Sequence, residues 1–267
     1  MTMKGPADFD IATLRARRTN KWHKFPLDVL PAWVADMDFG VAPSITTALA
    51  RLTRDQEYGY AARDGVLAAA FVRRMERRFG WRTDPADTVA IGDLVQASFS
   101  SVIAFSEPGD AILLQLPSYP PFMRAIEDTG RRLIPNPMRD DGTRWVLDLG
   151  AYQAAHVPRL RMLIFCHPQN PTGRAFSRAE LEEVADFAIR HDLVVVSDEI
   201  HADIVYSGDT HIPLASLHPE IAARTITSAT KSFNIPALRC AVMHFGAPAL
   251  KEGFQKRIPS RLLGSPG

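Results

Sequence analysis

The sequence has few cysteines: only Cys166 and Cys240 occur among its 267 residues. Both lie inside apolar runs, which favours buried free thiols in a reducing cytoplasm and argues against a disulfide framework or a metal site. An excess of charge of either sign is also missing, because 31 Lys and Arg residues balance 30 Asp and Glu residues. The composition therefore gives no electrostatic reason to expect nucleic acid or an acidic membrane as a partner.

Long hydrophobic runs are absent too. No run approaches the roughly 18 residues that a membrane span needs, and the first 20 residues contain early acids and no apolar core like that of a signal peptide. Hydrophobic residues make up 46% of the chain and charged residues 23%, as in an ordinary globular protein. We therefore expect a cytoplasmic protein whose ligand is a small molecule.

What the sequence does contain is a regular alternation of strand and helix patterns from residue 88 onward. Short apolar runs predict strands, and amphipathic stretches predict helices: strands at 88–91, 111–116, 161–166 and 193–197, helices at 94–105, 122–129 and 177–190. Before them, a proline-punctuated, irregular arm over residues 1–40 is followed by helices at 43–53 and 65–79. Ser177 and Glu180 form the pattern of a capping box at a helix start. This order predicts an α/β fold with a mostly parallel central sheet flanked by helices.

Polar residues follow three of the predicted strands. Tyr119, Asn170 and Asp198 each come within a few residues of the point where an apolar strand ends. In sheets of this kind the carboxyl ends of the parallel strands meet at one edge and form the ligand crevice. We therefore expect these three side chains to lie close together.

One lysine stands in an unusual setting. Lys231 follows a strand pattern that ends at Ser228 and precedes Pro236, which forbids a regular helix or central strand, so it is predicted to lie in a loop between two strands. Ser228, Thr230 and Arg239 lie nearby in sequence and supply small donors and a planar cation, which is the equipment for holding a phosphate. A lysine beside a phosphate pocket suggests covalently attached pyridoxal 5′-phosphate. The alternative is a lysine that is simply a solvated loop charge.

The rest of the chain offers what a pyridoxal ring requires. The ring acts as an electron sink only while its nitrogen stays protonated, which calls for a buried carboxylate, and Asp198 is placed to supply it unless it is only a turn residue. Tyr119 is placed to pack on the ring face. Asn170 and His201 can donate hydrogen bonds to the phenolic oxygen, although Asn170 can also be the start of an Asn-Pro turn.

A phosphate group is favoured at the N-terminus of a helix. The backbone amides of Leu94 and Val95 begin the predicted helix at 94–105 and can bind it, with Ser228 and Arg239 completing the site. Asp93 opposes this arrangement, because its negative charge is unfavourable there unless the side chain points away.

Three motifs carry a resemblance to a known family. The chain resembles fold-type I pyridoxal phosphate enzymes of the class I/II aminotransferase superfamily, through Ser228–Lys231 with Arg239, Asn170–Gly173, and Ser197–Glu199. Cys240 is atypical after the arginine. Within the superfamily, Tyr119–Phe122, Asp198–His201 and Lys231–Pro236 are similar to the MalY/PatB group of cystathionine β-lyase-like carbon-sulfur lyases. Ordinary aminotransferases usually carry a tyrosine where His201 stands.

The resemblance runs from about Trp33 to the end of the chain and implies a domain organisation. Residues 1–55 would form an N-terminal arm and the start of the small-domain region, and residues 56–267 the large domain that binds pyridoxal phosphate. The family continues beyond the position of Gly267 into a long helix and a smaller C-terminal domain, which usually supplies the arginine that grips the substrate carboxylate. We expect a chain without that domain to bind cofactor but to process amino acids poorly.

The resemblance also implies a reaction. In a β-elimination lyase, Lys231 is the catalytic residue that removes the Cα proton of a sulfur-containing amino acid, and pyruvate, ammonia and a thiol result. An aminotransferase, which shares the Cα deprotonation, is the first alternative, and a truncated, non-catalytic pyridoxal-binding or regulatory protein is the second. In the family a tyrosine of the neighbouring subunit reaches the phosphate, which implies a homodimer in which Tyr60 makes that contact.

Overall fold

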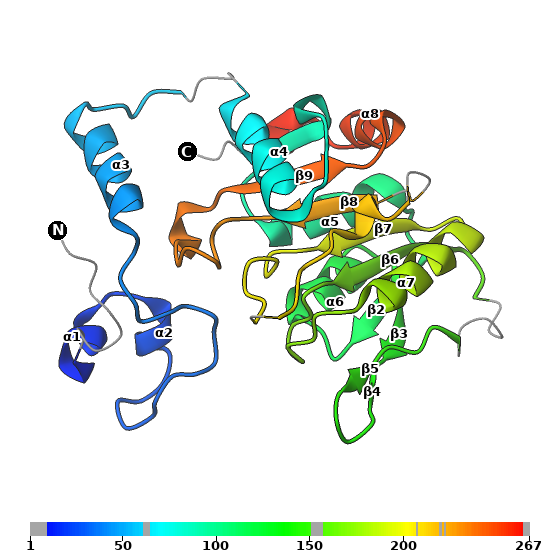
Figure 1. The fold of residues 1–267 in the computed structure, drawn as a ribbon, viewed down its shortest axis with the longest axis horizontal. Helices are drawn as coiled ribbons and strands as arrows, with labels where there is room; N and C mark the ends of the chain where they lie inside the picture. The colour runs from blue at the N-terminus through cyan, green and yellow to red at the C-terminus, as the bar shows by residue number, and fades with distance from the viewer. Residues whose placement is uncertain are drawn as a thin grey trace. The chain divides into compact units, whose positions relative to one another are not determined.

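The computed structural model describes residues 10–60, 65–150, 157–206, 208–218, 221 and 223–263 (Figure 1). The described residues divide into two compact units. The smaller unit contains the residues up to 60 together with 229–239, and the larger unit contains the residues from 65 to 228 and from 240 to 263. Each unit is described by itself below.

The helices and strands alternate along most of the chain. The helices are α1 (Ile11–Ala16), α2 (Asn20–His23), α3 (Pro43–Arg54), α4 (Val66–Phe79), α5 (Leu94–Phe105), α6 (Pro120–Glu127), α7 (Arg178–Arg190) and α8 (Pro248–Arg257). The strands are β1 (Thr88–Ile91), β2 (Ala111–Leu116), β3 (Arg132–Pro137), β4 (Arg139–Asp140), β5 (Trp145–Val146), β6 (Leu160–Cys166), β7 (Val194–Asp198), β8 (Ala223–Thr227) and β9 (Ala241–Phe245). Within the described ranges, no helix is long and apolar enough to pass through a lipid bilayer.

The smaller unit holds α1, α2 and α3. The expectation of a wholly irregular arm over residues 1–40 is wrong for its described part, because α1 forms there with Asp10 as its N-cap, accepting a hydrogen bond from the Thr13 amide at 2.7 Å. Residues 1–9 of that arm lie outside the described residues. Helix α3 begins with Pro43 at its first position, as expected, but none of its residues is buried.

The larger unit is built on a seven-stranded sheet with the order β1-β9-β8-β7-β6-β2-β3. The strands from β8 to β3 run parallel to their neighbours, whereas β9 is antiparallel to both β8 and β1. The predicted mostly parallel sheet with flanking helices is therefore confirmed. Because β1 and β8 are both antiparallel to β9, these two strands point in the same direction.

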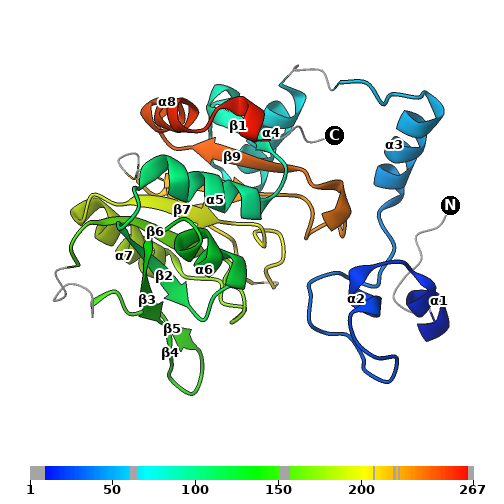
Figure 2. The same ribbon diagram turned by 180° about the vertical axis from the view of Figure 1, so that it is seen from behind.

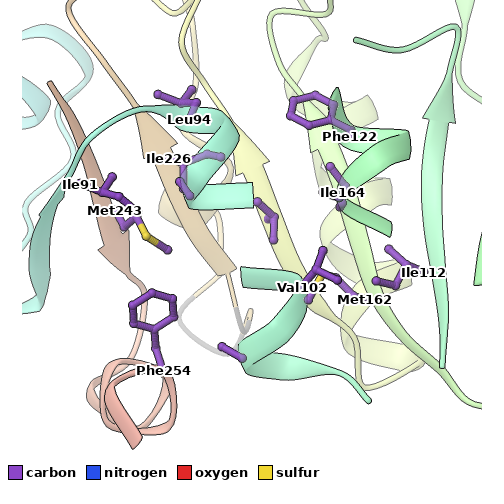
Figure 3. Close-up of a cluster of buried hydrophobic side chains, with 14 of the residues drawn as sticks. Ile91, Leu94, Val102, Ile112, Phe122, Met162, Ile164, Ile226, Met243 and Phe254 are labelled. Carbon is purple, nitrogen blue, oxygen red and sulfur yellow. The ribbon is translucent and has the colours of Figure 1, made fainter. Parts of the chain in front are cut away.

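Helices cover both faces of this sheet (Figure 2). On one face, side chains of α5, α6 and α8 belong to one buried cluster with residues of the strands, and Figure 3 shows Phe122 near Ile164 and Phe254 near Met243. On the other face, α7 packs on Leu163 and its neighbours, and α4 contacts Val242 of β9. Burial of these apolar surfaces is the main force that fixes the strand ends in place.

Local sequence signals decide where most elements begin. The capping box is confirmed, because Ser177 accepts from the Glu180 amide and Glu180 Oε2 accepts from the Ser177 amide at 2.8 Å. Helix α6 begins at Pro120, two residues before the predicted start, because proline suits the first turn of a helix. Strand β3 and the β4–β5 hairpin were not predicted.

Candidate active site

The carboxyl ends of six strands, β1, β8, β7, β6, β2 and β3, lie at one edge of the sheet in the larger unit. Strands β2, β6, β7 and β8 are parallel neighbours, and β1 points the same way. Tyr119 follows β2, Asn170 follows β6, and Asp198 is the last residue of β7. The structure thus places the three polar residues at the same edge, where ligands of parallel sheets bind.

Asp198 is buried at this edge, with an exposed fraction of 4%. Its carboxylate accepts a hydrogen bond from the Ile200 amide, Oδ1 to N, at 3.0 Å. Asp198 lies opposite Cys166 in the β6–β7 register, and burial together with the charge of Asp198 raises the pKa of the Cys166 thiol well above its usual value. A carboxylate in this position is suited to accept a hydrogen bond from a buried cationic N–H group and to keep that nitrogen protonated.

Tyr119 lies within the electrostatic reach of two carboxylates. Burial raises the pKa of its phenol, and the negative charges of Asp198 and Asp93 raise it further. The ring is 41% exposed and lies edge-on to Phe122, with 5.7 Å between the ring centroids. Tyr119 therefore offers an accessible aromatic face near Asp198.

Asn170 stands in a turn that a buried glutamine holds. Gln169 donates from Nε2 to the Pro117 carbonyl at 2.6 Å and accepts from the Thr172 amide at 2.8 Å. It thereby joins the turn after β6 to the loop after β2. Gln169 was not among the predicted site residues. Its position between two prolines just after a buried strand is a pattern that could have indicated its role in the turn.

The start of α5 lies at the same edge of the sheet. Asp93 is its N-cap, and the Asp93 carboxylate accepts a hydrogen bond from the Gln96 amide at 2.8 Å. The negative charge that is unfavourable for a phosphate site thus belongs to a side chain that caps the helix. The amides of Leu94 and Val95 belong to the first turn, which in any helix has no intrahelical acceptor. The Ser228 hydroxyl, at the end of β8, donates to the Cys240 carbonyl at 2.6 Å.

Glu199, next to Asp198, is a buried acid that the sequence reasoning used only as part of a motif. Its carboxylate accepts hydrogen bonds from the Ser197 hydroxyl at 2.8 Å and from the Leu214 amide at 3.0 Å, and it contacts Nε2 of His211 at 2.8 Å. These contacts fix the turn that carries His201, which is half-buried two residues later. Glu199 is thus a structural support for the strand end.

The smaller unit contains the lysine. Lys231 lies in the connection from β8 to β9, as predicted, and donates from Nζ to the Ala35 carbonyl at 3.0 Å. The connection is internally bonded, because the Thr230 carbonyl accepts from the Ile235 amide at 2.9 Å. Arg239 is exposed and has a left-handed backbone, with φ of 45°.

The predicted site residues fall in both units. Tyr60, Thr230, Lys231 and Arg239 belong to the smaller unit, and the remaining seven predicted residues belong to the larger one: Leu94, Val95, Tyr119, Asn170, Asp198, His201 and Ser228. Tyr60 is fully exposed in the single chain. Among the described residues, no group of three or more His, Cys, Asp or Glu side chains is arranged to hold a metal ion.

The larger unit has a mostly parallel sheet with helices on both faces, and a buried aspartate ends β7. A loop that contains a lysine follows β8. These features can be compared with those of known protein families. Residues 34–262 match the family model of aminotransferase class I and II. The chain belongs to this family.

Individual known proteins are similar to this chain in sequence and in structure. The chain is 36% identical over 242 residues to a cystathionine beta-lyase of Corynebacterium glutamicum, covering 90% of this chain and 64% of that protein. It is 35% identical over 219 residues to the cystathionine beta-lyase PatB of Bacillus subtilis, covering 81% of this chain and 57% of that protein. The PLP-bound C-S lyase of Staphylococcus hominis superposes with a TM-score of 0.85 at 26% identity, covering 91% of this chain and 63% of that one. The chain thus spans less than two thirds of the length of each of these relatives.

Proposed function

We propose that this chain binds pyridoxal 5′-phosphate and cleaves the carbon-sulfur bond at Cβ of a sulfur-containing amino acid such as cystathionine. The observation that carries the proposal is the conjunction of the buried Asp198 at the strand-end edge with relatives that are named cystathionine beta-lyases. The bond from Cα to hydrogen and the bond from Cβ to sulfur break, the proton leaves with the sulfur as a thiol, and water releases pyruvate and ammonia.

The residues of the larger unit suit the ring of this cofactor. When bound, pyridoxal phosphate supplies an acceptor for the electrons that the Cα–H bond releases. Asp198 holds a proton at the ring nitrogen, because a buried carboxylate favours the charged form of a neighbouring base. Tyr119 would cover one face of the ring, and the Asn170 amide and His201 would donate hydrogen bonds to its phenolic oxygen.

The phosphate and the reacting carbon need further partners. In the larger unit, the amides of Leu94 and Val95 would bind the phosphate. In the smaller unit, Arg239 and Thr230 would be further donors to it. Ser228 contributes a donor only if its hydroxyl leaves the Cys240 carbonyl, to which it donates at 2.6 Å. Lys231 attaches the cofactor and takes the proton from Cα, which is the role of an amine held near the reacting carbon.

Product analysis tests the reaction. Purified chain is incubated with pyridoxal phosphate and cystathionine, and pyruvate, ammonia and thiol are measured. Equal amounts of the three support the lyase, whereas a keto acid that forms only with an added amino acceptor indicates an aminotransferase, the activity after which the family is named. Cofactor binding without any turnover indicates a binding or regulatory protein and contradicts the proposal.

Borohydride reduction tests the lysine. Reduced protein is digested and the cofactor-bearing peptide is identified by mass spectrometry. The label is expected on Lys231, and Lys231→Ala is expected to remove it, whereas Lys256→Ala, a change in an exposed position of α8, leaves it in place. A label on another lysine in the unaltered chain sinks the assignment of Lys231.

We further propose that the active form is a cytoplasmic homodimer in which Tyr60 contacts the phosphate bound by the neighbouring copy. In support, the smaller unit exposes large apolar side chains in the single chain, including Leu27, Leu30 and Phe39. A second copy that covers such side chains gains hydrophobic stabilisation. Free thiols at Cys166 and Cys240 agree with a reducing compartment.

A further inference from the structure

The side-chain amide of Asn234 holds a short backbone segment of the smaller unit. Its Oδ1 accepts from the Met37 amide at 2.9 Å, and its Nδ2 donates to the Met37 carbonyl at 2.8 Å and to the Phe39 carbonyl at 3.3 Å. One side chain thus bonds both polar backbone groups of Met37, as a neighbouring strand would. We call residues 35–39 the clamped segment.

Lys21 and Trp22 hold the clamped segment through the Asp36 backbone carbonyl and the Asp38 carboxylate. Lys21 is buried and donates from Nζ to the Asp36 carbonyl and to Asp38 Oδ2, each at 2.7 Å. The indole of Trp22 donates to Asp38 Oδ1 at 2.7 Å. Burial raises the pKa of Asp38, but the hydrogen bonds from Lys21 and Trp22 and the charge of Lys21 outweigh it, so the pKa is lowered overall. The segment is therefore held by side-chain hydrogen bonds at Asp36, Met37 and Asp38.

The backbone at Asn234 explains why an asparagine suits this position. Its φ of 55° lies in the left-handed region, which asparagine tolerates better than most residues. Its own amide donates to the Lys231 carbonyl at 3.3 Å, and the Phe233 amide donates to the Ala229 carbonyl at 3.0 Å. Glycine would accept this backbone but provide no amide, and aspartate would keep the acceptor but lose both donors.

The geometry points to Asn234 as a positioning residue for Lys231. By fixing the clamped segment against the lysine loop, it places the Ala35 carbonyl 3.0 Å from Nζ of Lys231. A carbonyl in that place holds the amine whenever it carries a proton, since hydrogen bonding to a charged form favours that form. The inference deepens the proposed function, because it assumes that Lys231 is the amine that attaches the cofactor and handles the Cα proton.

Chemical labelling of the cofactor-free full chain tests the inference. Lysines are reductively methylated with formaldehyde for limited times, and the extent at each lysine is read by peptide mass spectrometry. In Asn234→Gly the rate at Lys231 is expected to rise by about three- to tenfold, since a lost hydrogen bond of a charged donor is worth about tenfold in equilibrium. Lys24, whose ammonium lies over the Trp33 ring, serves as the internal reference. Its rate is expected to stay unchanged.

Hydrogen exchange supplies a second readout. The Met37 amide is expected to exchange faster in Asn234→Gly, and to a smaller extent in Asn234→Asp, which keeps the acceptor for that amide. Asp192→Gly is the control, because Asp192, an exposed residue in the turn before β7, also has a left-handed backbone, with φ of 50°. Circular dichroism verifies that each variant is folded.

The outcomes separate the inference from the proposed function. An unchanged Lys231 rate or unchanged Met37 exchange in folded Asn234→Gly overturns the inference, even if borohydride fixes the cofactor on Lys231. Equal effects in Asp192→Gly also overturn it. If both readouts change as expected but borohydride fixes no cofactor on Lys231, the clamp is real and the proposed function fails.

Discussion

Acidification is expected to destabilise this protein through one histidine, His244 of β9. Its side chain is only 4% exposed and packs between the rings of Phe71 and Trp81, with centroid distances of 5.5 and 5.1 Å. Its Nδ1 lies 3.0 Å from the Thr88 hydroxyl. Burial lowers its pKa from 6.5 to about 4, and the negative charges of nearby acids oppose this only in part.

The size of the effect follows from this pKa. In the unfolded chain, His244 is protonated as the pH falls through 6.5. In the folded chain, the same side chain is protonated only when the pH falls to about 4. The free energy of unfolding therefore decreases as the pH falls from 6.5 to 4, and His244 does not reduce it above pH 6.5. The loss amounts to about 1 kcal/mol at pH 5.5 and to about 2 to 3 kcal/mol at pH 4.5.

Urea unfolding of the unaltered chain and of His244→Asn measures this contribution. The Oδ1 of asparagine can replace Nδ1 as the partner of the Thr88 hydroxyl, and asparagine does not titrate in this range. The variant loses a constant amount of packing energy, so the informative quantity is how the difference in unfolding free energy changes with pH. From pH 7.5 to pH 4.5 the difference is expected to shift by about 2 to 3 kcal/mol in favour of the variant. A difference that stays constant over this range refutes the reasoning, because it means that His244 titrates alike in the folded and unfolded chains.

Three further changes test the site and its supports. Asp198→Asn is expected to abolish carbon-sulfur cleavage while weakening cofactor binding far less, as shown by product formation and by equilibrium dialysis; unchanged turnover would make Asp198 a mere turn residue. Ser177→Ala removes the cap of α7 and is expected to lower the free energy of unfolding by about 1 kcal/mol in urea titrations, and no loss would mean that the capping box contributes nothing. Tyr60→Ala is expected to lower cofactor affinity, and sedimentation of the unaltered chain is expected to give a dimer at micromolar concentration; a monomer with full cofactor occupancy would contradict the role of Tyr60.

Most of the central sheet could be predicted because its parallel strands are buried on both faces and so appear as continuous apolar runs. Strand β3 escaped because its sequence contains Pro135 and Pro137. Proline is tolerated there since β3 lies at the edge of the sheet, with β2 as its neighbour. The reversed direction of β9 could not be predicted either, because strand pairing is decided by packing between distant parts of the chain and not by local pattern.

The place of three candidate site residues at one edge of the sheet was also predictable. The sequence predicts Tyr119, Asn170 and Asp198 at one edge, because the carboxyl ends of parallel strands meet there. The hydrogen bond between Asn234 and Met37 joins residues 197 positions apart, so no local sequence pattern predicts it. The hydrogen bonds of Glu199 with Leu214 and His211 could not be predicted for the same reason, because these partners lie outside the motif that contains Glu199.

The pairing of β1 with β9 also sets the order in which the fold can be completed. Thr88 and His244 are 156 positions apart, and among the described strands β1 pairs with β9 alone. A chain that emerges from the ribosome amino end first therefore exposes the backbone of β1 until nearly all of the larger unit has been synthesised. Such non-local pairing slows folding and leaves unpaired strand edges open to aggregation. Chaperone demand during synthesis is thus expected to be greatest before Ala241–Phe245 becomes available, at the stage when β1 still lacks its partner strand.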